Sequence, residues 1–214
     1  MTKGVYSEFE VQEQHIKVKG EDSFLDMNCV GSSEEELEVK VITKNCRGVV
    51  AKKKVKGTGN GTLTESLHVP YTIYNMIYDM VHEDELLEGV VGYGQKSTHP
   101  EFALTQKVLD EDDVVKLKAY PRCILESGPK RPVENGAEEV PELELTISLL
   151  PDDYGFCMYE ALASAVSSTV ADTWLTAFTS DLVRPASGES GAEGATGESG
   201  AEGATGATGE STSG

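Results

Sequence analysis

Hydrophobic and polar residues alternate in several short stretches of the chain, which is the pattern of half-buried β-strands. The most regular stretch is ELELTISL at 142–149, whose apolar positions share one face: Leu143, Leu145, Ile147 and Leu149. Further strand-like runs lie at 34–43, 49–56, 62–69, 101–109 and 114–120. We therefore expect a mainly β protein, in the α+β sense, in which residues such as Glu142 and Glu144 face away from the core.

Two polar segments between these runs are candidate hairpin turns. GTGNG at 57–61 contains glycines and an asparagine, which adopt positive φ readily. The segment predicts that the runs at 49–56 and 62–69 form a hairpin. The acidic segment DEDD at 110–113 predicts a second hairpin between the runs at 101–109 and 114–120.

Two other segments are expected to be helical. Residues 71–80 follow Pro70, a residue that suits a helix start. The second helix is expected from Met158 to Ala165, extending toward Phe178 with Trp174 as its anchor. Several strands with one or two packed helices indicate a β-sandwich or a barrel-like domain.

The C-terminal end has a different composition. From Gly188 to Gly209, glycine recurs at every third position, as in collagen, but no proline follows Pro185. A triple helix needs imino acids to pre-set its backbone, and short triplets of Ala, Ser, Thr and Glu bury too little to offset chain entropy. We expect a folded domain at 1–183 and a disordered, collagen-like Gly-X-Y tail at 184–214.

The charge of the chain limits its partners. The net charge is −19, and the tail contributes five Glu and no Lys or Arg from Gly188 onward, which leaves −14 for the rest. Such a surface repels a nucleic-acid duplex, so any nucleic acid that the protein meets would be tolerated and not gripped. We expect no membrane segment, because no apolar run approaches 18 residues, and no export signal. The four cysteines are far apart, which favours buried, reduced thiols.

Catalytic and metal-binding patterns are incomplete in this sequence. His82-Glu83 lacks the second histidine of the zinc-protease motif, and the acidic run at 110–113 lacks the glycine and terminal glutamate of a calcium loop. GYGQ at 92–95 is not a phosphate-binding fingerprint, and no serine lies in GxSxG. We expect no enzymatic activity, no cofactor and no metal.

A basic cluster stands out in the otherwise acidic chain: Lys52, Lys53, Lys54 and Lys56. Strand alternation places Lys53 on one face and the other three on the opposite face. The cluster lacks the interleaved aromatic residues of a nucleic-acid surface. It is expected either to block wrong edge pairing or to pair with an acidic run on a neighbouring subunit, such as Glu34, Glu35 and Glu36.

Long segments of the sequence resemble the major tail tube proteins of long-tailed, siphovirus-type phages that infect Gram-positive bacteria. The resemblance is carried by HPEFALTQKVLDEDDVVKLKAYPRC at 99–123, ENGAEEVPELELTISLLPDDYG at 134–155, MYEAL at 158–162 and WLTAFTSDLV at 174–183. It covers most of 1–183, and the Gly-X-Y tail lies outside it.

The resemblance implies a tail tube fold in a virion protein that assembles in the host cytoplasm. Six subunits would close into a ring, and rings would stack around a tape-measure protein, between tail terminator and distal tail proteins. The acidic lumen would carry DNA during ejection. Candidate lumen residues are Glu142, Glu144, Thr146 and Ser148; an outer surface or a ring-to-ring contact is the alternative for this face.

Two other functions remain open from the sequence. A tail completion or baseplate protein of similar fold would form discrete rings instead of tubes. A collagen-like surface adhesin would explain the Gly-X-Y tail but not the lack of an export signal.

Overall fold

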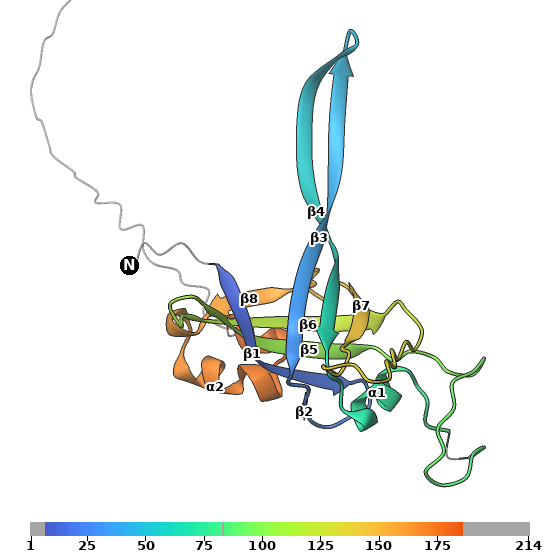
Figure 1. Cartoon of the computed structure of the whole chain (residues 1–214). Coiled ribbons are helices and arrows are strands. Elements are labelled where there is room, and N and C mark those ends of the chain that lie inside the picture. Colours follow the sequence, from blue (N-terminus) through green and yellow to red (C-terminus); the bar gives the residue numbers. More distant parts are fainter. Residues whose placement is uncertain (1–6, 83, 186–214) are drawn as a thin grey trace, which may run out of the picture. The chain divides into compact units, whose positions relative to one another are not determined.

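The computed structural model describes residues 7–82 and 84–185, and one antiparallel sheet with two α-helices dominates this part (Figure 1). The strands are β1 (Glu8–Val18), β2 (Leu25–Asp26), β3 (Val30–Cys46), β4 (Val49–Leu67), β5 (Phe102–Asp110), β6 (Val115–Leu125), β7 (Leu143–Leu149) and β8 (Tyr159–Leu162). The helices are α1 (Tyr71–Ile77) and α2 (Ser168–Ala177), with short 3₁₀ turns at Ala163–Ala165 and Ser180–Val183. The expected mainly β class is confirmed. The tail predicted at 184–214 lies outside the described residues, apart from Arg184 and Pro185.

The sheet curls so that its two sides approach each other. The strand order is β2-β1-β5-β6-β7-β4-β3, with β8 paired to β6. β1 and β3 lie side by side, yet no ladder of backbone hydrogen bonds joins them within the described residues. The result is an open barrel, and the unpaired line between β1 and β3 is called the seam below.

The interior of this open barrel is the larger hydrophobic core. Residues from strands far apart in the chain meet there, including Ile16, Leu63, Leu104 and Ile147, each at most 1% exposed. Helix α1 adds its apolar side to the same core through residues such as Ile73 and Ile77. Burial of these side chains is the main source of stability for the barrel.

Helix α2 covers the outer surface of β5 and β6. Trp174 is 1% exposed, packs with Leu117 and Ala119, and donates a hydrogen bond from Nε1 to the Lys118 carbonyl oxygen at 3.0 Å. The predicted role of Trp174 as a helix anchor is confirmed. No helix among the described residues is long and apolar enough to cross a membrane.

Several strand predictions are also confirmed. β5 and β6 form the hairpin around DEDD, with Leu109 opposite Val115. β7 matches the alternating stretch, since Leu145, Ile147 and Leu149 are buried and Glu144 is exposed. The predicted helix at 71–80 exists but ends at Ile77.

The hairpin predicted around GTGNG is wrong. Residues 49–67 form the single strand β4, whose partner is β3, and the turn lies at Arg47-Gly48, where φ is 51° and 78°. Positive φ at both positions is the signature of a tight two-residue hairpin turn. The glycines of GTGNG instead form a bulge, because the pairing moves from Leu37–Gly61 to Val39–Gly57.

The conformation of this bulge requires glycine. A side chain on Gly61 would place its Cβ 2.7 Å from the Glu36 carbonyl oxygen, and Gly59 has a φ of 85°. Glycine runs serve close backbone approach in a twisted bulge as well as in turns. The composition of the segment alone does not distinguish these two uses.

The helix predicted to begin at Met158 is also wrong in its first part. Tyr159–Leu162 form strand β8, which pairs with residues 116–119 of β6, and α2 begins only at Ser168. The partner strand β7 reaches β6 only at residues 123–125. The remaining backbone groups on that side of β6 need hydrogen bonds, and this demand overrides the local helical preference of MYEAL.

A buried polar network spans the interior next to the seam. The Gln106 amide donates to Glu65 Oε1 at 2.7 Å and to Gln14 Oε1 at 2.8 Å, and the Gln14 amide donates to Glu65 Oε2 at 3.1 Å. The Ser33 hydroxyl donates to Glu65 Oε1 at 3.5 Å. These residues come from β5, β4, β1 and β3, so side chains connect the two sides of the seam.

Glu65 is the acidic member of this network and is fully buried. Burial raises its pKa to about 7, although the hydrogen bonds from Gln14, Ser33 and Gln106 act in the opposite direction. A carboxyl group whose pKa is raised on folding favours the folded state less as the pH rises. The stabilisation of the folded state by protonated Glu65 is fully present below pH 4.5 and is lost as the pH rises through about 7.

We predict that Glu65→Gln removes this pH dependence. Relative to the variant, the wild-type protein should lose about 3 kcal/mol of unfolding free energy between pH 4.5 and pH 8, measured by urea denaturation across that range. Glu144→Gln, on the exposed side of the neighbouring strand, is the control and should track the wild type. Parallel stability curves for wild type and Glu65→Gln would contradict the prediction.

Candidate assembly surfaces

The outer parts of β3 and β4 form a two-stranded arm that extends from the barrel (Figure 1). We define the arm as residues 37–60, which run from the glycine bulge to the turn and back. Most of its side chains are exposed, in contrast to the buried half of β4 that begins at Gly61. Among the described residues, the arm's strands pair only with each other beyond the bulge.

The register of the arm sorts its side chains onto two unlike faces. Val41 pairs with Val55 and Val39 pairs with Gly57, so one face is apolar near the bulge, and it carries Thr43 and Lys53 nearer the turn. The opposite face carries Ile42, which lies opposite Lys54 and is 49% exposed. It also carries the following lysines: Lys40, Lys44, Lys52, Lys54 and Lys56. Apolar residues remain exposed on the first face: Val39 is 58%, Val41 48% and Val55 56% exposed.

Direct pairing of like charges makes the basic face unfavourable in the isolated chain. Lys40 lies opposite Lys56, and Lys44 lies opposite Lys52. Like charges directly opposite each other on neighbouring strands destabilise a sheet. An anionic partner surface would remove this repulsion, so the arrangement suits contact with another molecule.

The structure extends the lysine cluster predicted from the sequence. Lys52, Lys54 and Lys56 share a face and Lys53 lies on the other face, opposite Thr43. Lys40 and Lys44 join the cluster from β3. They were missed because they are distant in sequence, and only the register of β3 against β4 brings them next to the others.

A second surface, which we call the acidic face, is the outer side of β3, β4 and β7 at the base of the arm. β4 lies between the other two, with Thr64 opposite Glu34 on one side and Thr146 on the other. The structure thereby places two predicted groups on one surface: Glu34 and Glu36 with Glu144, Thr146 and Ser148. Glu142, just before β7, is also exposed.

Glu35 has a different environment from its two neighbours. It points to the other side of β3, where its carboxylate accepts a hydrogen bond from the Tyr120 hydroxyl at 2.6 Å and lies 3.5 Å from Lys118 Nζ. Burial and the nearby Glu35 carboxylate raise the pKa of Tyr120 well above its ordinary value, so its hydroxyl stays a donor. The carboxylate of Glu35 therefore has partners within its own chain, whereas Glu34 and Glu36 face outward.

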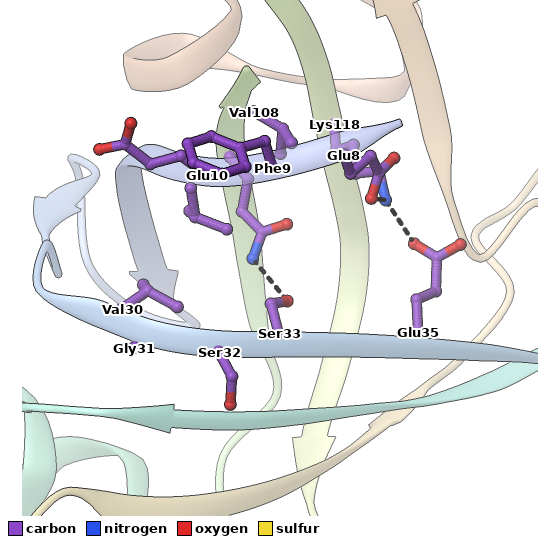
Figure 2. A pocket seen from close by; sticks show the side chains of 12 residues that line it. Glu8, Phe9, Glu10, Val30, Gly31, Ser32, Ser33, Glu35, Val108 and Lys118 are labelled. Atoms are coloured by element: carbon purple, nitrogen blue, oxygen red, sulfur yellow. Dashed lines mark hydrogen bonds and ion pairs between the residues drawn. The ribbon is translucent and has the colours of Figure 1, made fainter. Parts of the chain in front are cut away.

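Lys118 connects the two sides of the seam by charge. Its ammonium group lies 2.9 Å from Glu8 of β1 and 3.5 Å from Glu35 of β3 (Figure 2). Although partial burial raises the pKa of Glu8, hydrogen bonds from Lys118 and Lys116 hold it below its ordinary value. A cleft of about 180 Å³ lies here between β1 and β3, lined by Phe9, Val30 and Ser33 among others.

Two aspartates at turns, Asp110 in the DEDD segment and Asp152 after β7, accept hydrogen bonds from the backbone of their own turns. The Asp110 carboxylate accepts hydrogen bonds from the backbone N–H groups of Asp112 and Val114, so it closes the DEDD turn. Asp152 accepts from Tyr154 and Phe156 in the same way. Within the described ranges, no group of three or more metal-ligating side chains is gathered.

The cysteine prediction is right for two positions and wrong for two. All four thiols are free, but only Cys123 and Cys157 are buried, and burial raises the pKa of each. Cys46 is exposed because it lies next to the turn of the arm. Cys29 is exposed in the link before β3, where it adopts a φ of 72°.

Comparison with known proteins gives distant structural similarities only. The chain is similar to a chain in the baseplate of the anti-feeding prophage, with 14% identity over 75% of this chain and 97% of that one, at a TM-score of 0.39. It is similar to a chain of the tube-terminating cap of the anti-feeding prophage, with 10% identity over 75% and 96%, also at 0.39. These scores are too low to establish a shared function. No protein-family profile and no curated protein matches.

We predict that Lys118→Ala destabilises the barrel by about 2 kcal/mol, because Glu8 and Glu35 would lose the buried cation between them. Chemical denaturation at pH 7 measures the change. The matched control is Lys19→Ala, which removes an ion pair to Glu101 from a lysine side chain that is 73% exposed and should cost less than about 0.5 kcal/mol. Equal effects of the two substitutions would show that the seam does not depend on Lys118.

Proposed function

We propose that this chain is a structural protein of a phage tail and that its copies polymerise, as stacked hexameric rings, into the tail tube. The observation that carries the proposal is the arm, which exposes a row of valines on one face and opposed lysines on the other. Neither face has a partner surface among the described residues, and both suit burial against another subunit. The sequence resemblance described above supplies the kind of assembly.

The geometry of the sheet suits assembly into rings. Within residues 7–82 and 84–185, β3 pairs with β4 on one side only, and the first part of β1, before its short pairing with β2, has an edge that no strand pairs with. Unpaired edges are sites where a further strand or segment can be added. Contacts between unlike surfaces close a ring when the rotation allows it and continue without limit along an axis.

We further propose that the inside of this tube is a channel for DNA, and the acidic face supports this role. Glu34, Glu36 and Glu144 lie on one sheet surface with small polar side chains between them. Placed toward the lumen, such a surface repels phosphate groups and offers DNA no cationic site at which to pause. In this role the chain acts without enzymatic chemistry, its DNA contact is transient, and its other partners are the tape-measure, tail terminator and distal tail proteins.

We predict that the purified protein forms rings or tubes at high concentration or beside a tape-measure partner, because the arm's exposed valines favour burial between subunits. Sedimentation and negative-stain electron microscopy measure the outcome. Long tubes would support the tail tube role, and discrete rings alone would favour a tail completion or baseplate protein. A monomer at millimolar concentration, with or without the tape-measure protein, would refute the proposal.

We further predict that Glu142→Lys combined with Glu144→Lys spares folding and tail assembly but slows DNA ejection several-fold at low salt. Both side chains are exposed, and their replacement would place cations along the DNA path. Virions carrying the substitutions are triggered in vitro, and DNA release is timed at low and high salt. Glu138→Lys with Glu139→Lys, in the loop before β7, makes the same charge change and is the control.

The slowing should disappear at high salt, where the lysine–phosphate attraction is screened. Ejection at the wild-type rate in low salt would place the acidic face away from the DNA. The tube role would then still stand on the assembly experiment.

A further inference from the structure

The chain contains two Asn-Gly pairs, Asn60-Gly61 and Asn135-Gly136. In such a pair the backbone nitrogen of the glycine can attack the side-chain amide carbon of the asparagine. Glycine leaves this nitrogen accessible because it has no Cβ. The reaction also requires a backbone that can rotate until the two atoms meet. The sequence makes the two pairs equal candidates for this reaction, but their surroundings in the structure differ.

The backbone of the first pair is held inside the sheet. Gly61 is buried and lies between two strands, opposite Leu37 of β3 and opposite Leu149 of β7. The backbone N–H of Asn60 donates a hydrogen bond to Thr58 Oγ1 at 3.2 Å. Rotation of this backbone would break the pairing of β4 on both sides. The Asn60 side chain therefore reacts only when this part of the sheet opens.

The second pair lies in an exposed turn. Residues 126–142, all of which the structure describes, form no strand or helix between β6 and β7. Asn135 and Gly136 are both exposed, and Gly136 has a φ of 79°, as the glycine of a type II turn has. A Cβ built on Gly136 would meet no atom within 4 Å. Within the described ranges, neither residue makes a hydrogen bond, so nothing restrains this backbone.

The base of the same segment is anchored to the barrel. The guanidinium carbon of Arg131 lies 4.0 Å from the centre of the Tyr74 ring, and its Nη2 donates to Asn75 Oδ1 at 3.5 Å. On the other side of the turn, the chain enters β7 at Leu143. The turn can therefore bend between two fixed points, and the barrel stays folded while it does so.

We propose that Asn135-Gly136 is a modification site, at which the folded protein slowly converts the asparagine amide into a carboxylate without an enzyme, while Asn60-Gly61 stays intact. The backbone nitrogen of Gly136 gives its proton to hydroxide and forms a bond to Asn135 Cγ. The bond from Cγ to the amide nitrogen breaks, and this nitrogen takes a proton from water and leaves as ammonia. The product is a cyclic imide.

Water then opens the imide at one of its two carbonyl carbons. Attack at Cγ gives an aspartyl residue at position 135, and attack at the main-chain carbonyl gives an isoaspartyl residue, which adds one carbon to the backbone of the turn. Water is the only reactant, and no atom is oxidised or reduced. Each event adds a negative charge to a turn that already carries the exposed carboxylates Glu134 and Glu138. This chemistry needs no partner and does not rest on the proposed assembly.

The test follows both pairs in one sample of the full chain. The protein is kept at a dilution at which sedimentation shows monomers, at neutral and at mildly alkaline pH. Proteolytic peptides are then resolved by chromatography and mass spectrometry. Conversion at Asn135 should be at least about tenfold faster than at Asn60, because Asn60 must wait for local opening of the sheet. Both rates should rise with pH, because hydroxide removes the proton from the attacking nitrogen.

Unfolding provides the matched control, because both pairs have the same two residues. In guanidinium chloride the two rates should become nearly equal. The variant Gly136→Ala places a Cβ beside the attacking nitrogen and should slow conversion at Asn135 at least about fivefold. Circular dichroism confirms that this variant folds.

Two results would overturn the proposal. One is equal conversion of the two pairs in the folded protein. The other is an intact Asn135 in the folded protein after a time in which the unfolded chain converts both pairs. Neither result bears on the tube role, which stands or falls with the assembly experiment.

Discussion

The unpaired seam between β1 and β3 is the constraint on which the rest of the structure depends. The sheet curls far enough to enclose a core, but its closing strands are joined by side chains instead of a backbone ladder. Gln14, Glu65 and Gln106 span the interior, and Lys118 connects Glu8 with Glu35 near the cleft. These buried polar contacts are stable only while every partner is present.

The open seam has a consequence for the strand that borders it. Because no strand among the described residues pairs with the other edge of β3, this strand can continue beyond the barrel together with β4. The glycine bulge lets both strands twist out of the barrel wall without a side-chain clash at Gly61. Past the bulge, the alternation that buries residues such as Leu63 exposes valines instead. The apolar face of the arm is thus a continuation of the core-facing side of the sheet.

Local sequence patterns predict the structure correctly where a strand pairs with the strand next to it in the chain. The alternation in β7 and the DEDD turn between β5 and β6 were both read correctly from the sequence. Patterns failed where distant backbone decides the outcome: β8 forms because β6 has unpaired groups, and GTGNG is a bulge because β3 continues beside it. Ser167 is a local signal for the start of α2, because its side chain accepts a hydrogen bond from the Val170 N–H and caps the helix.

The candidate surfaces also combine features that the local sequence predicts with features that only the fold determines. The lysines of β4 and the glutamates of β3 were found as charge clusters, but their grouping depends on registers that no local pattern contains. Glu34 lies beside the outer side of β7 because Thr64 of β4 stands between them, and Lys40 and Lys44 join the basic cluster only through the β3–β4 pairing. The sequence shows which charged residues are present, but only the fold determines which of them lie next to one another.

The outward-facing residues of β3 give the molecule an electrostatic direction. Along one strand, the even-numbered positions change from Glu34, Glu36 and Glu38 near the barrel to Lys40 and Lys44 toward the turn. Two copies placed arm to arm would bring lysines together, and two placed base to base would bring carboxylates together. Copies that all point the same way along an axis avoid both of these repulsive contacts. A polymer built in this way is polar, with the basic arms directed toward one end and the acidic bases toward the other.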